Sequence, residues 1–441
     1  MLCLTAETWN GEPMNIIERG RAFVETLRGL VRGAHGWQRC PYCGSWATIR
    51  NGRYRRKPWE EEGRSERRMQ RHLCQHCHKS YTEQLPDLVD RSWYARAVHR
   101  KVIDMHLHPG SSLRRTIEWV RSELGKQERY LLWHPLAEEP GEGERCHLSV
   151  RTGERWLAQA GLVAADSVPG QLEGIGSSGE MATDGLWARL RKGVKRVGLV
   201  LVECASGLVY PPVVVKDEDS AASWGVLFAR IEAAGLSLKK INGLVSDGAH
   251  GLLSYLRQAL PWVHQQRCVW HIWRSLGGRM AQQVKAAIHG LKGEAARKVA
   301  EEVRDRLGGA IHAILDAASY DEAEQALARL RLLEWGEPLA RWLEPLLDAA
   351  LMHLLPCHQG LLRVSPEWVW RDFRLRLSHG RNHGSELRLE RALLVWAIYH
   401  NFTPAQWRSE QKRKYRHPGQ SPLEAAGAPP GKLSYLDALG V

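Results

Sequence analysis

Two closely spaced cysteine pairs constrain the fold of this 441-residue chain more than any other feature of its sequence. Cys40 and Cys43 form one C-x-x-C pair, and Cys74 and Cys77 form a second, with 30 residues between the pairs. Four thiolates at this spacing suit one tetrahedral Zn²⁺ ion, because each pair can grip the ion from a tight turn. Reduced core cysteines or redox-active cysteines are the alternative. We predict a structural zinc site within a zinc ribbon over residues 37–85.

The segment between the two cysteine pairs is strongly basic. It carries nine Lys and Arg residues against four Glu residues. A basic strand-loop-strand held by a metal clip is suited to contacting phosphate groups, although a solvated charged loop would have the same composition. The candidate phosphate-contacting side chains of this segment are Arg53, Arg55, Arg56 and Lys57.

The composition of the whole chain narrows the class of protein. The chain has 62 Lys and Arg residues against 49 Asp and Glu residues, which gives a formal charge of +13. This charge favours a polyanionic partner, but net charge alone does not distinguish DNA from RNA, or either of them from a charge that serves only solubility. Charged residues make up 25% of the chain and hydrophobic residues 44%, which excludes wholesale disorder. Nine cysteines are too few for a secreted disulfide scaffold. Without a long apolar run or a signal-peptide pattern, we expect a cytoplasmic, nucleoid-associated protein and no membrane partner.

Periodicity and composition divide the chain into six segments. They are a short helical segment (1–36), the zinc ribbon (37–85), a helix-turn-helix-like segment (91–165), a segment with mixed strand and helix character (180–271), an all-helical segment (272–355) and final helices with a basic tail (356–425).

The helix-turn-helix prediction depends on two helical stretches separated by a long polar segment. The second helix would begin after Ser149, with Arg151, Thr152, Glu154 and Arg155 available to a DNA major groove. Pairs of helices are common, so an ordinary helical hairpin is the alternative.

From residue 180 the hydrophobic period changes from helical to strand-like. The pattern predicts three strands, a helix, a strand, a helix and a final strand, which is an α/β fold with helices packed on a mixed sheet. The predicted elements are strands at Glu180–Leu190, Val194–Cys204, Gly207–Val215, Ile241–Val245 and Val263–Gln266, and helices at Ser220–Ala234 and His250–Leu260.

Two aspartates end predicted strands, and a glycine follows each of them. These are Asp184-Gly185 and Asp247-Gly248. Carboxylates at adjacent strand ends can converge on one point, and glycine lets the backbone turn close to a ligand. A convergent carboxylate pair is what hard divalent cations such as Mg²⁺ require. Asp-Gly is also a common turn signal, so both interpretations stay open on spacing alone.

The order of several motifs over residues 180–425 resembles that of mutator-like DDE transposases. The motifs are Thr183-Asp184-Gly185-Leu186-Trp187, Val245-Ser246-Asp247-Gly248, Leu260-Pro261 and Gln266-Arg267-Cys268-Val269-Trp270-His271. The resemblance implies an RNase H-like core with helices on both faces of its sheet. The same resemblance implies that a helical insertion interrupts this core between the second aspartate and the final glutamate. It also implies that Asp184, Asp247 and a glutamate bind two Mg²⁺ (or Mn²⁺) ions. Cys268 and His271 are marked as a motif near the active site, while a buried thiol and a hydrogen-bonded histidine would fit equally well.

Glu367 is the predicted third carboxylate, because the sequence that it begins resembles the family's glutamate helix. Arg371 and Arg374 follow four and seven residues later and share its helical face, where they could bind phosphate. A glutamate at a helix start is also favoured by the helix dipole alone. Glu386 and Glu390 are the alternative candidates.

Two further charged stretches receive different interpretations. Lys412, Arg413 and Lys414 lie near Trp407 and Tyr415, so this tail could track a DNA backbone, although a solvated tail has a similar composition. The acidic run at 217–219 precedes a helix, and we expect it to serve in helix capping and solvation.

The leading hypothesis is a transposase of a prokaryotic insertion sequence that acts on double-stranded DNA at element ends and at a target. The resemblance implies metal-dependent cleavage that exposes a 3′-hydroxyl, which then attacks target DNA without a protein nucleophile. A homo-oligomer is expected because two element ends must be brought together. The alternatives are a catalytically inactive zinc-ribbon/helix-turn-helix regulator derived from a transposase, and an RNase H-like nuclease.

Overall fold

The protein divides into two compact units. One comprises Met1–His99 with Ser122–Cys146, and the other comprises Arg100–Arg121 with His147–Val441. The computed structural model describes residues 39–89, 92–108, 111–132, 146–172, 175–358, 367–377, 384–404, 419–429 and 434–441. Within these ranges, no helix is long and apolar enough to cross a membrane.

The first unit contains a small antiparallel sheet with the strand order β1-β4-β5. The strands are β1 (Thr48–Arg56), β4 (Arg67–Cys74) and β5 (Ser80–Thr82), and a separate hairpin comprises β2 (Trp59–Glu60) and β3 (Gly63–Arg64). Met69, Leu88 and Ala95 form a small core beside β4. The register pairs Thr48 with Cys74, which brings the start of β1 next to the second cysteine pair.

The second unit is built on a five-stranded mixed sheet with the order β10-β9-β6-β7-β8. β6 pairs antiparallel with β7, and β7 pairs antiparallel with β8, whereas β6, β9 and β10 run parallel. The strands are β6 (Glu180–Arg189), β7 (Lys195–Glu203), β8 (Val213–Val215), β9 (Gly243–Ser246) and β10 (His264–Arg267). The predicted α/β class and the predicted strand order along the chain are therefore confirmed, with β8 shorter than expected.

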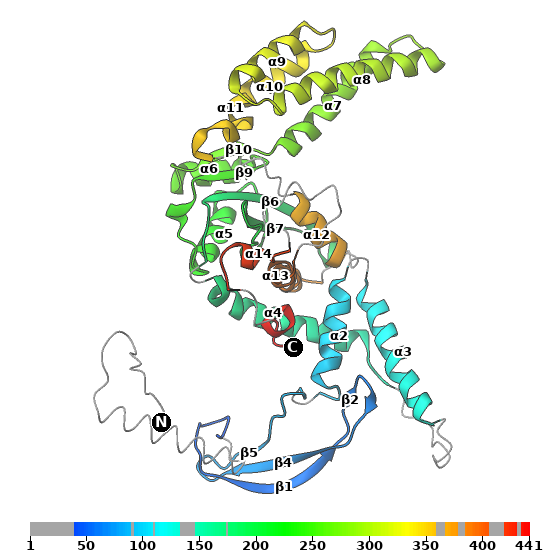
Figure 1. The fold of residues 1–441 in the computed structure, drawn as a ribbon, viewed down its shortest axis with the longest axis vertical. Coiled ribbons are helices and arrows are strands. Elements are labelled where there is room, and N and C mark those ends of the chain that lie inside the picture. The colour runs from blue at the N-terminus through cyan, green and yellow to red at the C-terminus, as the bar shows by residue number, and fades with distance from the viewer. Residues whose placement is uncertain are drawn as a thin grey trace, which may run out of the picture. The chain divides into compact units, whose positions relative to one another are not determined.

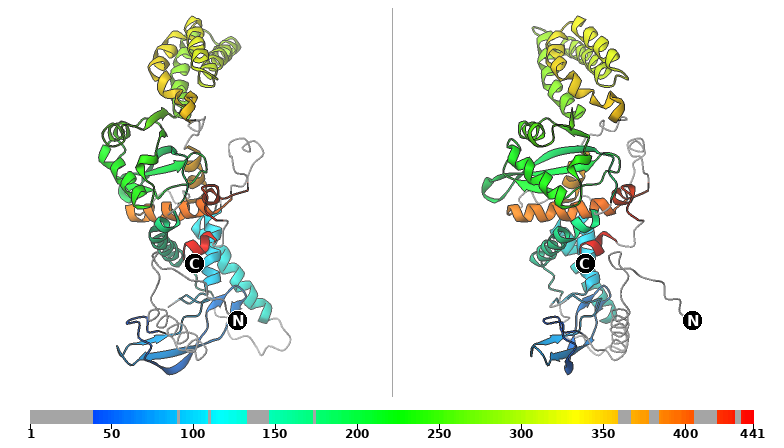
Figure 2. Two further views of the ribbon diagram at one scale, coloured as in Figure 1. Left: turned by 60° about the vertical axis from the view of Figure 1, so that its left-hand side comes forward. Right: turned by 90° about the vertical axis from the view of Figure 1, so that its left-hand side faces the viewer.

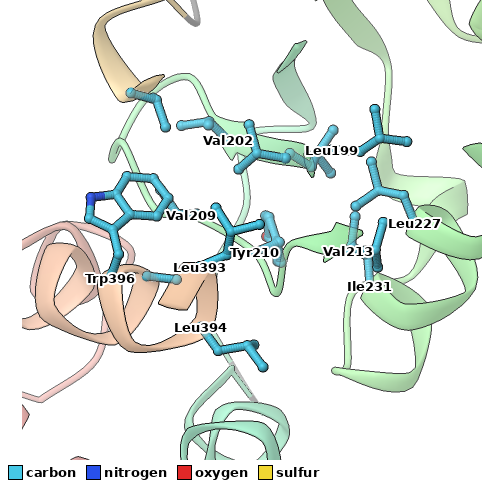
Figure 3. Close-up of a cluster of buried hydrophobic side chains, with 14 of the residues drawn as sticks. Leu199, Val202, Val209, Tyr210, Val213, Leu227, Ile231, Leu393, Leu394 and Trp396 are labelled. Carbon is cyan, nitrogen blue, oxygen red and sulfur yellow. The ribbon is translucent and has the colours of Figure 1, made fainter. Parts of the chain in front are cut away.

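Helices cover both faces of this sheet, because β7 is apolar on both sides. Figure 3 shows Leu227 and Ile231 of α5 against Leu199 and Val213, while Leu393 and Trp396 of α13 approach the sheet from the other side. The helices that pack around the sheet are α5 (Ala221–Ala233), α6 (His250–Ala259), α12 (Glu367–Leu377) and α13 (Glu386–Phe402), and the short helices α14 (Pro422–Ala425) and α15 (Tyr435–Ala438) contact α13.

Three helices precede the sheet in sequence: α2 (Arg96–Leu107), α3 (Leu113–Leu132) and α4 (Val150–Leu172). Gly153 of α4 lies against Leu113 and Ile117, so the starts of α3 and α4 pack together. Further along, α4 packs against α13, which lies between α4 and the sheet (Figure 2). The helix-turn-helix itself stays a prediction, since residues 133–145 lie outside the described residues.

The segment between β10 and α12 is a helical insertion with its own core. Its helices are α7 (Val269–Ala287), α8 (Gly293–Leu315), α9 (Tyr320–Leu332), α10 (Glu337–Leu343) and α11 (Leu347–Ala350). Figure 1 shows α7 to α10 gathered into one bundle. Leu307, Ile311, Leu330 and Leu339 are among its fully buried side chains, so the bundle has an apolar interior separate from that of the sheet.

Gly161 marks the closest approach of α4 to α13 and gives a test of this packing. A Cβ atom at Gly161 would lie 2.5 Å from Cβ of Arg391 and 3.1 Å from its Cα, so one helix must move. We expect Gly161→Val to destabilise the protein by about 1–3 kcal/mol, read as a lower midpoint of thermal unfolding.

Gly278 in α7 is the matched control, because a Cβ atom at this position would meet no other atom within 4 Å. Gly278→Ala should stabilise the helix by about 0.5–1 kcal/mol. An unchanged midpoint for Gly161→Val would contradict the close packing of α4 on α13.

Candidate active site

Asp184 and Asp247 lie level with each other where β6 and β9 pair in parallel. The prediction that each aspartate ends a strand holds for Asp247, which directly follows β9, but is wrong for Asp184, which lies in the middle of β6 because this strand continues along β7. Ala182 of β6 pairs with Val245 of β9, and each aspartate follows two residues later. The backbone N–H of Gly185 donates to Asp184 Oδ1 over 2.9 Å, and that of Ala249 donates to Asp247 Oδ1 over 2.9 Å. Parallel pairing thus brings both carboxylates to the same edge of the sheet.

Glu367 reaches this edge from the first turn of α12. One oxygen each from Asp184 and Glu367 and one ring nitrogen of His271 lie within 4.8 Å of one another. Arg374 Nη1 lies 3.0 Å from Glu367 Oε1, so the predicted shared helical face is present. Arg371 is exposed on the same helix.

The opposite side of α12 is anchored in the core, and this anchoring fixes where Glu367 lies. Trp370 and Phe373 are buried, and Trp396 Nε1 donates to Asp372 Oδ2 over 2.9 Å. Burial acts to raise the pKa of the Asp372 carboxyl, but His400, Arg376 and Trp396 together lower it to about 2. Asp372 is therefore a structural carboxylate, not a member of the candidate site.

The electrostatics of Asp184 show that several carboxylates face one another. Its side chain is 6% exposed. Burial is the largest cause that raises its pKa to about 8, followed by the charge of Asp247, and the charges of Glu367 and Glu218 add to the effect. A buried carboxylate beside like charges is costly to ionise unless a cation compensates. The donor set therefore suits a hard divalent cation, which prefers oxygen ligands.

The two residues of the predicted C-x-x-H motif have different surroundings. Cys268 is 1% exposed and packs with Ala182 and Val245 beneath the strand ends. His271, one turn into α7, lies beside the carboxylates. Burial lowers its pKa, while Asp247 and Glu367 act to raise it. Its Nδ1 atom is buried and has no hydrogen-bond partner among the described residues, so a neutral imidazole is available there as a ligand.

Glu218 is a member of the cluster that was not predicted from the sequence. Trp187 Nε1 donates to Glu218 Oε1 over 2.8 Å, and a Cβ atom at Gly185 would lie 2.1 Å from Glu218 Oε2. Burial, and then the charge of Asp247, raises the pKa of Glu218. The expected capping role holds for its neighbour Asp217, whose Oδ1 accepts from the backbone N–H of Ser220. An acidic run in a loop carries no periodicity that indicates which member faces inward.

Arg267 supplies a positive charge beside the carboxylates. A Cβ atom at Gly248 would lie 1.2 Å from Arg267 Nη1, so the guanidinium occupies the space that glycine leaves at the Asp247-Gly248 turn. Gly248 also has a φ of +78°, which L side chains rarely adopt. Arg267 belongs to one of the motifs found in the sequence, but no role was predicted for it.

Glu386 and Glu390, the alternative third carboxylates, form ion pairs elsewhere on the sheet unit. Glu386 pairs with Arg196 at the start of β7, and Glu390 Oε1 lies 2.5 Å from Arg230 Nη1 on α5. Neither carboxylate is among those that shift the pKa of Asp184 or His271. Within the described residues, Glu367 is the candidate that lies with Asp184.

The four ribbon cysteines converge on one point in the first unit. The Sγ atoms of Cys40 and Cys77 are 3.6 Å apart, as are those of Cys43 and Cys74, and all four lie within 4.8 Å of one another. With zinc–sulfur bonds of about 2.3 Å, a tetrahedral site needs sulfur atoms about 3.8 Å apart. The backbone N–H groups of Cys77 and His76 help to lower the pKa of the Cys74 thiol to about 6, whereas burial and the neighbouring thiols raise the pKa of Cys43. The geometry and the four sulfur donors fit Zn²⁺.

The candidate phosphate-contacting residues of the ribbon are not equivalent. Arg53, Arg55 and Lys57 are exposed, with Arg53 Nε donating to Gln70 and Arg55 paired with Glu66. Arg56 instead donates to the carbonyls of Val89 and Ser92, so its guanidinium holds the following loop in place.

The remaining candidates lie on α4 and in the basic tail. Arg151 and Arg155 are exposed in the first turns of α4, where Ser149 Oγ accepts from the backbone N–H of Thr152 as a helix cap. Trp156 is buried beside them. Lys412, Arg413 and Lys414 lie outside the described residues.

Comparison with known proteins identifies a relationship in the second unit. Residues 212–359 match the model of a family described as Transposase, Mutator family. The transposase for insertion sequence element IS905 from Lactococcus lactis subsp. lactis (strain IL1403) is 31% identical over 74 residues, which cover 17% of this chain and 18% of the relative. The predicted resemblance to mutator-like transposases is thereby confirmed. The chain thus matches less than a fifth of that relative's length. The family match includes Asp247 and His271, but it begins after Asp184 and ends before Glu367.

The raised pKa of Asp184 predicts how pH affects stability in the absence of Mg²⁺ and Mn²⁺. Folding raises the pKa of this carboxyl from 3.8 to about 8, so its contribution is favourable at low pH and is lost as pH rises towards 8. Asp184→Asn should remove this loss and stabilise the cation-free protein at pH 8 by at least about 1 kcal/mol.

Urea unfolding at pH 5 and at pH 8 checks this prediction. Asp166→Asn, at an exposed position of α4, serves as the control and should leave the pH dependence of the wild type intact. Equal pH dependence of the wild type and Asp184→Asn would contradict the clustering of charge around Asp184.

Proposed function

We propose that this protein is the DNA transposase of a prokaryotic insertion sequence and that Asp184, Asp247 and Glu367 form its catalytic carboxylate triad. The observation that carries the proposal is the meeting of Asp184 of β6, Asp247 just after β9 and the helix-start Glu367 at one sheet edge, where the pKa of Asp184 is raised to about 8. The match of residues 212–359 to the Mutator transposase family supports the transposase assignment.

The sheet of the second unit is, in this proposal, an RNase H-like core. Its support is the topology: β6, β7 and β8 are consecutive antiparallel strands, and β9 and β10 lie parallel to β6 on its other side. α5 and α6 provide the crossover connections between them. The helical insertion then separates the second aspartate from the glutamate helix.

The carboxylates would hold two Mg²⁺ or Mn²⁺ ions. When bound, such ions activate the attacking oxygen and stabilise the leaving oxygen of an in-line displacement at phosphorus. Asp184, Asp247 and Glu367 supply oxygen ligands, while Glu218 and His271 are further donors at the same edge. Their combined negative charge would favour a divalent over a monovalent cation.

Basic side chains around the site would bind and orient the DNA phosphates. Arg267 lies at the Asp247-Gly248 turn, and the exposed Arg371 lies one helical turn from Glu367. Because guanidinium groups form paired hydrogen bonds to phosphate, they can fix the scissile phosphate relative to the carboxylates. Arg374 is already paired with Glu367 and would restrain that side chain.

The front end of the chain would hold element-end DNA. Its proposed parts are a zinc ribbon on Cys40, Cys43, Cys74 and Cys77, and a helix-turn-helix formed by α3 and α4. Arg53, Arg55 and Lys57 of the ribbon, and Arg151 and Arg155 of α4, are the exposed cations available for double-stranded DNA. A homo-oligomer would bring the two ends of the element together in the nucleoid.

Cleavage and strand transfer on element-end DNA test the catalytic assignment. With Mg²⁺, Asp184→Asn, Asp247→Asn and Glu367→Gln should each lower the cleavage rate by at least about a hundredfold, or about 3 kcal/mol of transition-state stabilisation. Binding in a mobility-shift assay should persist, because the basic surfaces are unchanged.

Glu386→Gln and Glu390→Gln are the matched controls and should retain full activity. Unimpaired cleavage in any of the three triad variants would refute that residue's assignment. Cleavage without joined products would favour an RNase H-like nuclease, and binding without cleavage would favour a regulator derived from a transposase.

The role of the ribbon is tested by the salt dependence of DNA binding. Lys57→Ala should lower the slope of log affinity against log salt by about 1, because one phosphate contact is lost. Lys298→Ala on α8, where the lysine pairs with Glu294, should leave the slope unchanged. Equal slopes for Lys57→Ala and the wild type would exclude Lys57 from the interface.

A further inference from the structure

A second group of metal-binding side chains lies at the opposite edge of the sheet from the carboxylates. His264 is the first residue of β10, and Glu180 is the first residue of β6. Both pair in register with Gly243, the first residue of β9. Asp184 and Asp247 lie four residues after Glu180 and Gly243, past the stretch in which β6 and β9 pair, so the two groups are separate sites.

Two adjacent residues of the insertion complete this group. Cys357 and His358 lie in a short 3₁₀ turn, Pro356–His358. One nitrogen each from His264 and His358 and the Cys357 sulfur lie within 4.8 Å of one another. His264 Nδ1 is 3.0 Å from His358 Nε2. Tetrahedral ligands around zinc lie about 3.3–3.8 Å apart, so small rotations of the exposed Cys357 and His264 side chains would complete the geometry.

The buried partner of His358 favours a ligand role over simple packing. His358 Nδ1 lies 2.7 Å from Glu180 Oε1, and both side chains are nearly inaccessible, at 1% and 3% exposed. A carboxylate that accepts the Nδ1 proton fixes the ring and leaves the Nε2 lone pair for a metal, as is common for zinc-bound histidines. Without a metal, that lone pair can accept a proton from His264 Nδ1, and an ion would take the place of this proton.

We propose that His264, Cys357 and His358 bind a Zn²⁺ ion, with Glu180 orienting His358. Two imidazoles and one thiolate are the borderline-to-soft donors that select zinc over Mg²⁺. A water molecule would fill the fourth position. The site needs neither the ribbon cysteines nor the catalytic carboxylates.

The position of the site indicates its consequence for the fold. The ion would tie the end of the insertion to the starts of β6 and β10, closing a loop of more than 90 residues between His264 and Cys357. The turn that it fixes lies nine residues before Glu367. Zinc would thus fix where the chain returns from the insertion towards the glutamate helix.

Zinc content of the full-length protein, measured by mass spectrometry after exhaustive dialysis, tests the proposal. We expect two equivalents in the wild type, one in the ribbon and one at the new site. Cys357→Ser and His264→Gln should each retain one, and their exposed positions leave the fold intact. The double variant Cys40→Ser/Cys43→Ser should also retain one equivalent of zinc. Adding Cys357→Ser to this double variant should remove that equivalent. His312→Gln on α8, an exposed histidine beside Asp316, is the control and should keep two.

A second readout identifies the thiolate. After exchange with Co²⁺, the spectrum of the wild type minus that of Cys357→Ser should contain a sulfur-to-cobalt charge-transfer band. Two equivalents of zinc retained in either Cys357→Ser or His264→Gln would overturn the site, as would the loss of all zinc in Cys40→Ser/Cys43→Ser.

Discussion

Mutual repulsion among carboxylates is the constraint on which the sheet unit depends. Asp184, Asp247, Glu218 and Glu367 face one edge, and their charges, together with burial, raise the pKa of Asp184 to about 8. Because like charges repel one another, the scaffold must hold these groups in place. Parallel pairing of β6 with β9 sets the two aspartates level, and glycines at 185 and 248 leave room for Glu218 and for the guanidinium of Arg267.

The glutamate helix shows how the scaffold meets this requirement. Its buried face carries Trp370 and Phe373, and Asp372 is fixed by hydrogen bonds from Trp396 and Arg376. Its exposed face carries Glu367 and Arg371. α13 supplies Trp396 and itself lies between the sheet and α4, so stability in the core and placement of the charged residue come from the same contacts (Figure 2). The repulsion among the carboxylates lowers the stability of the fold, and the packing of α12 against α13 and the sheet offsets this loss.

The sequence predicts this arrangement wherever local pattern determines structure. Strand period and the two Asp-Gly pairs locate Asp184 and Asp247, because both are local properties of the sequence, although Asp184 lies within β6 and only Asp247 follows the end of its strand. The side chain of Glu218 was not predicted, since the inward turn of one residue in an acidic loop depends on Trp187 across the chain. Contacts between distant segments likewise decide two other features. Arg56 donates hydrogen bonds to two loop carbonyls, and His264 lies close to Cys357. The choice among Glu367, Glu386 and Glu390 needed the ion pairs that only the fold forms.

The most direct measurement of the central claim is the location of Mn²⁺ by anomalous scattering in crystals of the protein bound to element-end DNA. The account predicts Mn²⁺ peaks at ligand distance, about 2.1–2.3 Å, from oxygens of Asp184, Asp247 and Glu367, next to a DNA phosphate. Peaks bound by Asp184 and Asp247 with Glu386 or Glu390 in place of Glu367, or the absence of any peak at this sheet edge, would contradict it.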